Sequence, residues 1–94
     1  MAKQKLVERE GRDKALLALG QQIRTVRQAR GISQEDFAAH AGIARSYYGG
    51  IERGENNVAA LNLMRIALAL GVEVGDLFPR SETLREFLLS PPKS

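Results

Sequence analysis

Apolar positions recur along the chain at spacings of three and four, which places them on one face of successive helices. The clearest case predicts a helix over about residues 13–30, with Asp13 as its N-cap. Its apolar face consists of Leu16, Leu19, Ile23 and Val26. Alternating β-branched runs, which are typical of half-buried strands, are nearly absent. The pattern therefore predicts an all-α protein.

Glycines and capping residues divide the rest of the chain into short helices. We expect left-handed glycines to end four of the segments, at Gly31, Gly42, Gly54 and Gly71. The further segments expected to be helical are 34–41, 45–53, 60–70 and 81–89, with a short turn at 75–78. Ser33 is the predicted cap of the second helix, in a capping box with Asp36, and Ser81 is the predicted cap of the last. Ala44 and Ala59 precede helices without offering a side-chain cap.

These helices predict one domain at residues 13–78, with an additional segment at each end. Residues 1–12 are basic and are expected to form a flexible arm, whereas 79–94 are expected to form a C-terminal helix and a tail ending in Pro91 and Pro92. The core is expected to contain Phe37, Ala38, Ala41, Tyr48, Ile51, Leu63, Ile66, Ala67, Leu70, Leu77 and Phe78.

Composition excludes several classes of function. The 94 residues suffice for one small domain. Cysteine is absent, which excludes disulfides, thiolate catalysis and cysteine-based zinc sites. The lone His40 excludes a multi-histidine metal site and has no paired nucleophile, so we expect neither an enzyme nor a cofactor. No apolar stretch approaches a membrane span and the N-terminus does not resemble a signal peptide, so a cytoplasmic protein is expected.

Charge is distributed unevenly along the chain. Residues 1–31 contain eight Lys and Arg against three acids, a net +5, whereas residues 32–94 carry a net −2. A basic half on a small domain favours a polyanionic partner such as nucleic acid, although a solvated basic helix gives the same pattern.

The most informative stretch is residues 33–54, SQEDFAAHAGIARSYYGGIERG, in which Gly42 joins two short helices into a helix-turn-helix. With the flanking segments LGQQIR at 19–24, LMRIALALGV at 63–72 and DLF at 76–78, it resembles the lambda-repressor-like (XRE-type) DNA-binding domains. The resemblance covers about 60 of the 94 residues. It implies five short helices around one core, with segment 34–41 crossing the DNA backbone and segment 45–53 in the major groove.

The resemblance also implies roles for individual residues. Base contacts are expected from Arg45, Ser46 and Tyr47, and phosphate contacts from Gln34, Arg24, Arg53, Asn56 and Asn57. Arg27 and Glu52 are expected to form a structural ion pair between the first and third helices. The alternatives are phosphate or solvent contact for Arg45 and Ser46, packing on the next helix for Tyr47, and solvated surface for Arg24, Asn56 and Asn57. Arg53 could be structural or contact DNA.

Gly49 and Gly50 depart from the family pattern, because each weakens a helix interior by up to about 1 kcal/mol relative to alanine. Relatives often have a base-reading side chain at position 50. The two interpretations are a close approach of the backbone to the duplex, and a looser helix that becomes ordered on binding. Under either interpretation, direct contacts to bases are limited to Arg45, Ser46 and Tyr47. More of the sequence preference then depends on the shape of the DNA.

The resemblance predicts a sequence-specific DNA-binding transcriptional regulator, acting as a homodimer on a palindromic operator of double-stranded DNA. Restriction–modification controller proteins and other small stand-alone regulators both fit. Apolar residues beyond the needs of a small core predict the dimer interface: Val72, Val74, Leu77, Phe87, Leu88 and Leu89. The alternatives are an antitoxin that binds both DNA and a toxin, and a protein-interaction module. Contact with RNA polymerase is left open.

Overall fold

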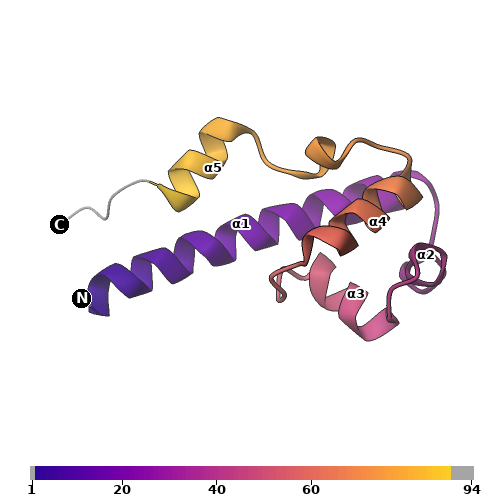
Figure 1. Ribbon diagram of the computed structural model, residues 1–94, viewed down its shortest axis with the longest axis horizontal. Coiled ribbons are helices and arrows are strands. Elements are labelled where there is room, and N and C mark those ends of the chain that lie inside the picture. The colour runs from indigo at the N-terminus through magenta and orange to yellow at the C-terminus, as the bar shows by residue number, and fades with distance from the viewer. Residues whose placement is uncertain (1, 90–94) are drawn as a thin grey trace.

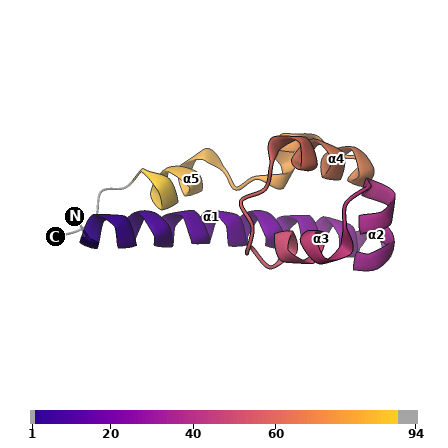
Figure 2. The ribbon, with the colours of Figure 1, turned by 60° about the horizontal axis from the view of Figure 1, so that its bottom comes forward.

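The computed structural model describes the backbone of residues 2–89 and the side chains of residues 9–89. Across this range the chain is helical without any strand, which confirms the predicted all-α class. The elements are α1 (Ala2–Ala29), α2 (Gln34–Ala41), α3 (Arg45–Glu52), α4 (Ala60–Leu70), the 3₁₀ helix η1 (Val74–Leu77) and α5 (Ser81–Leu88). Helices α2, α3 and α4 gather around the C-terminal half of α1, and α5 lies along its N-terminal half (Figures 1 and 2).

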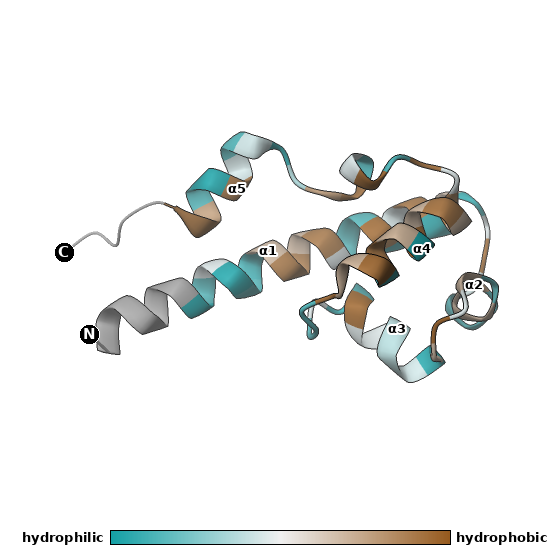
Figure 3. Cartoon of the chain, in the orientation of Figure 1, coloured by the Kyte–Doolittle hydropathy of each residue, from teal (hydrophilic) through white to brown (hydrophobic). Residues whose placement is uncertain are grey.

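The core lies between the C-terminal half of α1 and helices α2 to α4, where apolar faces meet (Figure 3). Phe37 and Tyr48 are fully buried there, with ring centroids 5.2 Å apart and ring planes tilted by 48°. The other fully buried large side chains are Ile23, Ile51, Ile66, Leu70 and Leu77. The predicted core is confirmed at these positions, whereas Leu63 is only partly buried and Phe78 is 37% exposed. Phe78 lies outside because the chain becomes extended at that residue and leaves the core.

Local capping explains the tight connection between α2 and α3. Ser33 accepts a hydrogen bond from the Asp36 backbone N–H at 3.1 Å, which confirms the predicted N-cap. The reciprocal bond that would complete the predicted capping box, from the Ser33 N–H to the Asp36 side chain, is not formed. Gly42 ends α2 with φ of 72°, a conformation that favours glycine, and its N–H bonds to the Ala39 carbonyl at 3.2 Å. Ala44 and Ala59 provide no side-chain cap, as expected. The other three predicted turn glycines also have positive φ.

Helix α1 begins at Ala2, so the predicted start near Asp13 and the predicted arm are wrong for residues 2–12. These residues are mostly strong helix formers, and their helix is packed against α5. At Gly11 the two helices approach so closely that a Cβ atom would overlap the Phe87 carbonyl oxygen. Met1 and the predicted tail at 90–94, including both prolines, lie outside the described residues.

The predicted cap of the last helix is one residue out of place. Arg80 has the extended conformation of an N-cap, without a side-chain hydrogen bond, and Ser81 is the first helical residue. None of the helices in the described part of the chain is both long and apolar enough to cross a membrane.

Candidate nucleic-acid interface

A buried polar network joins α1, α2 and α3. The Arg27 guanidinium donates to the Glu52 carboxylate at 2.7 Å from Nε and 3.1 Å from Nη2, which is the expected ion pair. The Tyr48 hydroxyl and the Gln34 amide also donate to this carboxylate, Gln34 at 3.1 Å. Arg27 in addition reaches the Ile32 carbonyl at 2.6 Å. The network therefore fixes the end of α3 and the start of α2 to the same point on α1.

Protonation of this network follows from burial and hydrogen bonding. Burial alone would raise the pKa of Glu52, but hydrogen bonds from Arg27, Tyr48 and Gln34 outweigh it, and the pKa lies below its ordinary value of 4.5. Burial and the bond to Glu52 raise the pKa of Tyr48. The hydrogen bond to Glu52 raises the pKa of Arg27. The carboxylate is thus charged and the phenol neutral around pH 7.

Backbone packing brings α3 close enough to α1 for this network. A Cβ atom at Gly20 would lie 2.6 Å from the Glu52 carbonyl oxygen, so only glycine permits this approach. A Cβ atom at Gly54 would similarly lie 2.6 Å from the Leu17 Cα atom, where the loop after α3 returns to α1. The contact between α1 and α3, and the contact between α1 and the loop after α3, therefore both require a glycine.

The opposite end of α3 is open to solvent. Arg45 and Ser46 are exposed in its first turn, close to Gln34 at the start of α2. With Gly49 and Arg53 these residues line an open cavity of about 380 Å³. The polar side chains here present guanidinium, hydroxyl and amide donors, and the start of α2 adds free backbone N–H groups. This arrangement suits phosphate oxygens and the acceptor atoms of base edges.

Both arginines at this surface already have acidic neighbours. Arg45 lies 3.8 Å from Glu35, with both side chains about 70% exposed. Arg53 donates to both carboxylate oxygens of Glu55, at 2.9 and 3.2 Å, and this hydrogen bonding raises the pKa of Arg53 and lowers that of Glu55. A phosphate that binds either arginine therefore competes with a nearby carboxylate for the guanidinium, which was not predicted from the sequence.

The two glycines of α3 have different surroundings. Gly50 is covered by Asn56, whose amide donates to the Tyr47 carbonyl at 3.4 Å and occupies the space of a Cβ atom. The interpretation that the duplex closely approaches the backbone at Gly50 is therefore wrong, because Asn56 occupies that space. Gly49 instead lines the open cavity, where a Cβ atom would lie 3.0 Å from the Arg53 guanidinium.

The remaining predicted contact residues differ in exposure. Tyr47 is half-buried and packs against the core, and Asn56 is half-buried over α3. Arg24 and Asn57 are exposed, and neither lines the cavity. His40 is exposed, as expected. Within residues 9–89, no three His, Asp or Glu side chains come together as metal ligands.

The predicted dimer interface is only partly exposed. Leu77 is fully buried in the core, so its assignment to an interface is wrong, and Val72 and Phe87 are half-buried. The exposed members are Val74 at 38%, Leu88 at 53% and Leu89 at 74%. Helix α4 also has an exposed apolar row that was not predicted, although its members are spaced by three and four residues: Leu61, Met64 and Leu68.

A tight turn between two short helices, with donor groups at both helix starts, defines a DNA-binding helix-turn-helix domain. Comparison with known proteins agrees, because the model of a family described as helix-turn-helix matches residues 23–77. The chain belongs to this family, and its resemblance to XRE-type domains is confirmed.

Similar proteins include two control proteins and one regulator solved in complex with DNA. The control protein C.MunI from Mycoplasma sp is 36% identical over 63 residues, which are 66% of this chain and 85% of that protein. The restriction-modification controller protein C.AhdI from Aeromonas hydrophila is 46% identical, with a TM-score of 0.66 over 67% of this chain and 96% of that one. The biofilm regulator SinR, solved in complex with DNA, is 35% identical, with a TM-score of 0.61 over 63% and 95%.

Proposed function

We propose that this protein is a sequence-specific transcriptional regulator that binds a palindromic DNA operator as a homodimer. The observation that carries the proposal is the exposed first turn of α3 beside the start of α2, with Arg45, Ser46 and Gln34 around one cavity. The first turn of a helix in the major groove is the part that reaches base edges. The buried network behind it ties the start of α2 to the end of α3.

Each of these residues has a distinct part in the proposed complex. Arg45 binds the O6 and N7 atoms of a guanine, the commonest specific contact of arginine in the major groove. Ser46 binds an adjacent base or phosphate. Gln34 donates one amide hydrogen to Glu52, and its second hydrogen together with the free N–H groups of α2 binds a phosphate. The phosphate contacts orient α3, and Arg45 supplies the sequence preference.

The similarity to C.MunI and C.AhdI favours a controller protein of a restriction–modification system over other small regulators. One domain with two or three base-reading side chains specifies few base pairs. A two-fold dimer doubles the number of base pairs that are contacted, with its two recognition helices roughly 34 Å apart on the duplex. We assign the dimer contact to the exposed apolar residues of η1 and the end of α5, Val74, Leu88 and Leu89.

Selection from a random double-stranded DNA library, with the bound complex sized, tests the function. The expected result is a palindrome bound by two chains. Weak, salt-sensitive binding without sequence preference would contradict the proposal and favour the antitoxin or interaction-module alternative.

Charge introduced on α5 tests the dimer assignment. The double variant Leu88→Asp/Leu89→Asp should dissociate to monomers in sedimentation and lose cooperative binding to the palindrome. Leu68→Asp is the matched control, because Leu68 is the most exposed residue of the apolar row on α4, at 81%. Dissociation by the control alone would move the interface to α4.

A further inference from the structure

The N-terminal half of α1 projects beyond α3, and one of its faces lies on the same side of the molecule as α3. The helix-turn-helix match begins at residue 23, so this half lies outside it. Helix α3 packs on α1 at Gly20, and the loop after α3 touches α1 at Leu16 and Leu17. Arg12 and Arg9 precede Leu16 by four and seven residues, so all three share one face of the helix. The face of α1 that contacts α3 therefore also carries Arg9 and Arg12, closer to the N-terminus of the helix.

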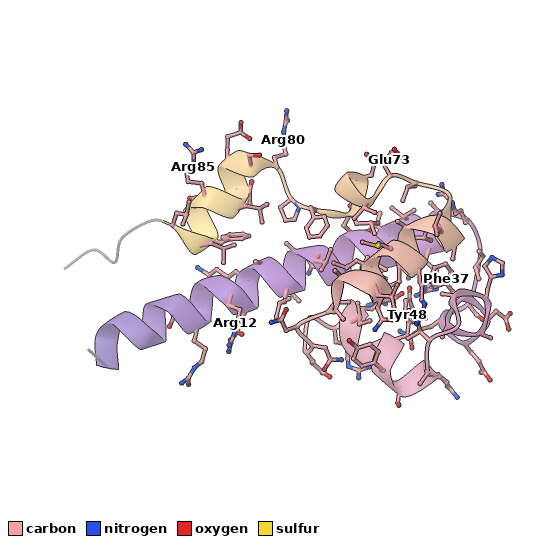
Figure 4. All side chains as sticks on the ribbon, in the orientation of Figure 1. Arg12, Phe37, Tyr48, Glu73, Arg80 and Arg85 are labelled. Carbon is pink, nitrogen blue, oxygen red and sulfur yellow. The ribbon has the colours of Figure 1, made fainter. Side chains whose placement is uncertain are left out.

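Both arginines are exposed, and the opposite face of this half is covered. Arg12 has a loose ion pair with Asp13 at 3.8 Å, with both side chains about 60% exposed. Helix α5 packs on the far side, at Gly11. In Figure 4, Arg12 points to the side of α1 on which α3 lies, whereas Arg80 and Arg85 point away on the α5 side. The packing of α5 therefore fixes which way the arginines face.

We propose that Arg9 and Arg12 form a second phosphate-contact site, on duplex adjacent to the part touched by α2 and α3. The inference rests on the proposed function. Arg9 lies eleven residues from Gly20, about 16 Å along the helix axis. Double-stranded DNA carries one charge per roughly 1.7 Å of its axis, so a duplex that continues past α3 offers many phosphates within this span.

Salt dependence of binding provides the test. Affinity of the full chain for its selected operator is measured by fluorescence anisotropy over a range of salt concentrations, for wild type and for Arg9→Gln/Arg12→Gln. The matched control is Arg80→Gln/Arg85→Gln, which removes the same charge from the opposite side.

The expected result is a smaller slope of log affinity against log salt for Arg9→Gln/Arg12→Gln, by about 1.8 per bound chain for two lost phosphate contacts. The control Arg80→Gln/Arg85→Gln should keep the wild-type slope. An unchanged slope in this variant, or an equal loss in the control, would overturn the inference alone. A wild-type chain without sequence preference would overturn the proposed function and the inference with it.

Discussion

Two arginine–carboxylate pairs in this molecule have the same chemistry and opposite surroundings. Arg27 and Glu52 are buried, with exposed fractions of 7% and 5%, and two further side chains donate to the same carboxylate. Arg45 and Glu35 are exposed, and their charged atoms are 3.8 Å apart. Water and a ligand can replace the exposed partner, whereas nothing can replace the buried one without unfolding. The difference suggests that burial separates the charges that maintain the fold from those available to DNA.

Removing the buried arginine should have the largest effect. Arg27→Ala leaves the Glu52 carboxylate buried without its main partner, so we expect a loss of about 3–5 kcal/mol in the free energy of unfolding. Urea denaturation followed by circular dichroism measures it. Arg45→Ala is the control and should unfold like wild type. Equal midpoints for all three proteins would contradict the structural role of the buried pair.

The exposed arginine should matter for binding instead. Arg45→Ala should weaken binding to the selected operator by about 1–3 kcal/mol and relax the preference at one position of each half-site. Gln34→Ala should weaken binding to all sequences alike, because its proposed contact is a phosphate. Competition assays against single-base variants of the operator separate the two effects. An Arg45→Ala protein that retains its full sequence preference would remove Arg45 from the base-reading set.

Acid should weaken the fold through Glu52. Its pKa in the folded protein lies below 4.5, so the folded state binds this proton less readily than the unfolded state. The contribution of the Glu52 carboxylate to the free energy of unfolding is fully present above about pH 4.5. It is lost as the pH falls through the pKa of Glu52 in the folded protein. Thermal unfolding between pH 7 and pH 3 should show this decline, and Glu52→Gln should show a shallower one. Parallel profiles would mean that other carboxylates cause the acid sensitivity.

The smallest expected effect concerns the acid beside Arg45. Glu35→Gln removes a carboxylate that competes with DNA for the guanidinium, so operator affinity should rise by about twofold to threefold at low salt. The gain should vanish at high salt, because exposed charges are screened. Glu82→Gln is the matched control, because Glu82 is likewise exposed in the first turn of a helix, α5, and has no ion pair with Arg45. A fall in affinity would show that Glu35 holds Arg45 in its binding position.

Much of the fold was predictable because local signals agreed with each other. The Ser33 cap, the Gly42 turn and the apolar spacing of α4 each specify a boundary or a face within a few residues. The start of α1 was not predictable in this way. Residues 2–12 lack an apolar stripe and resemble an arm, and their position depends on α5, which is about 75 residues away in sequence.

The site was predictable in its residue types but not in its contacts. The position of Arg45 and Ser46 at a helix start follows from the motif. The covering of Gly50 by Asn56 and the pairing of Arg53 with Glu55 depend on the path of the loop after α3, which no periodicity specifies. Leu77 was assigned to an interface because its apolar character alone does not distinguish a core from a contact surface.

The central claim is that the starts of α2 and α3 form the DNA-binding surface. Cross-saturation from the protons of a bound operator to the amides of the deuterated protein measures this contact directly. The account predicts the strongest transfer at Gln34, Arg45 and Ser46. Transfer concentrated on the α4 row at Leu61, Met64 and Leu68, with none at the start of α3, would contradict it.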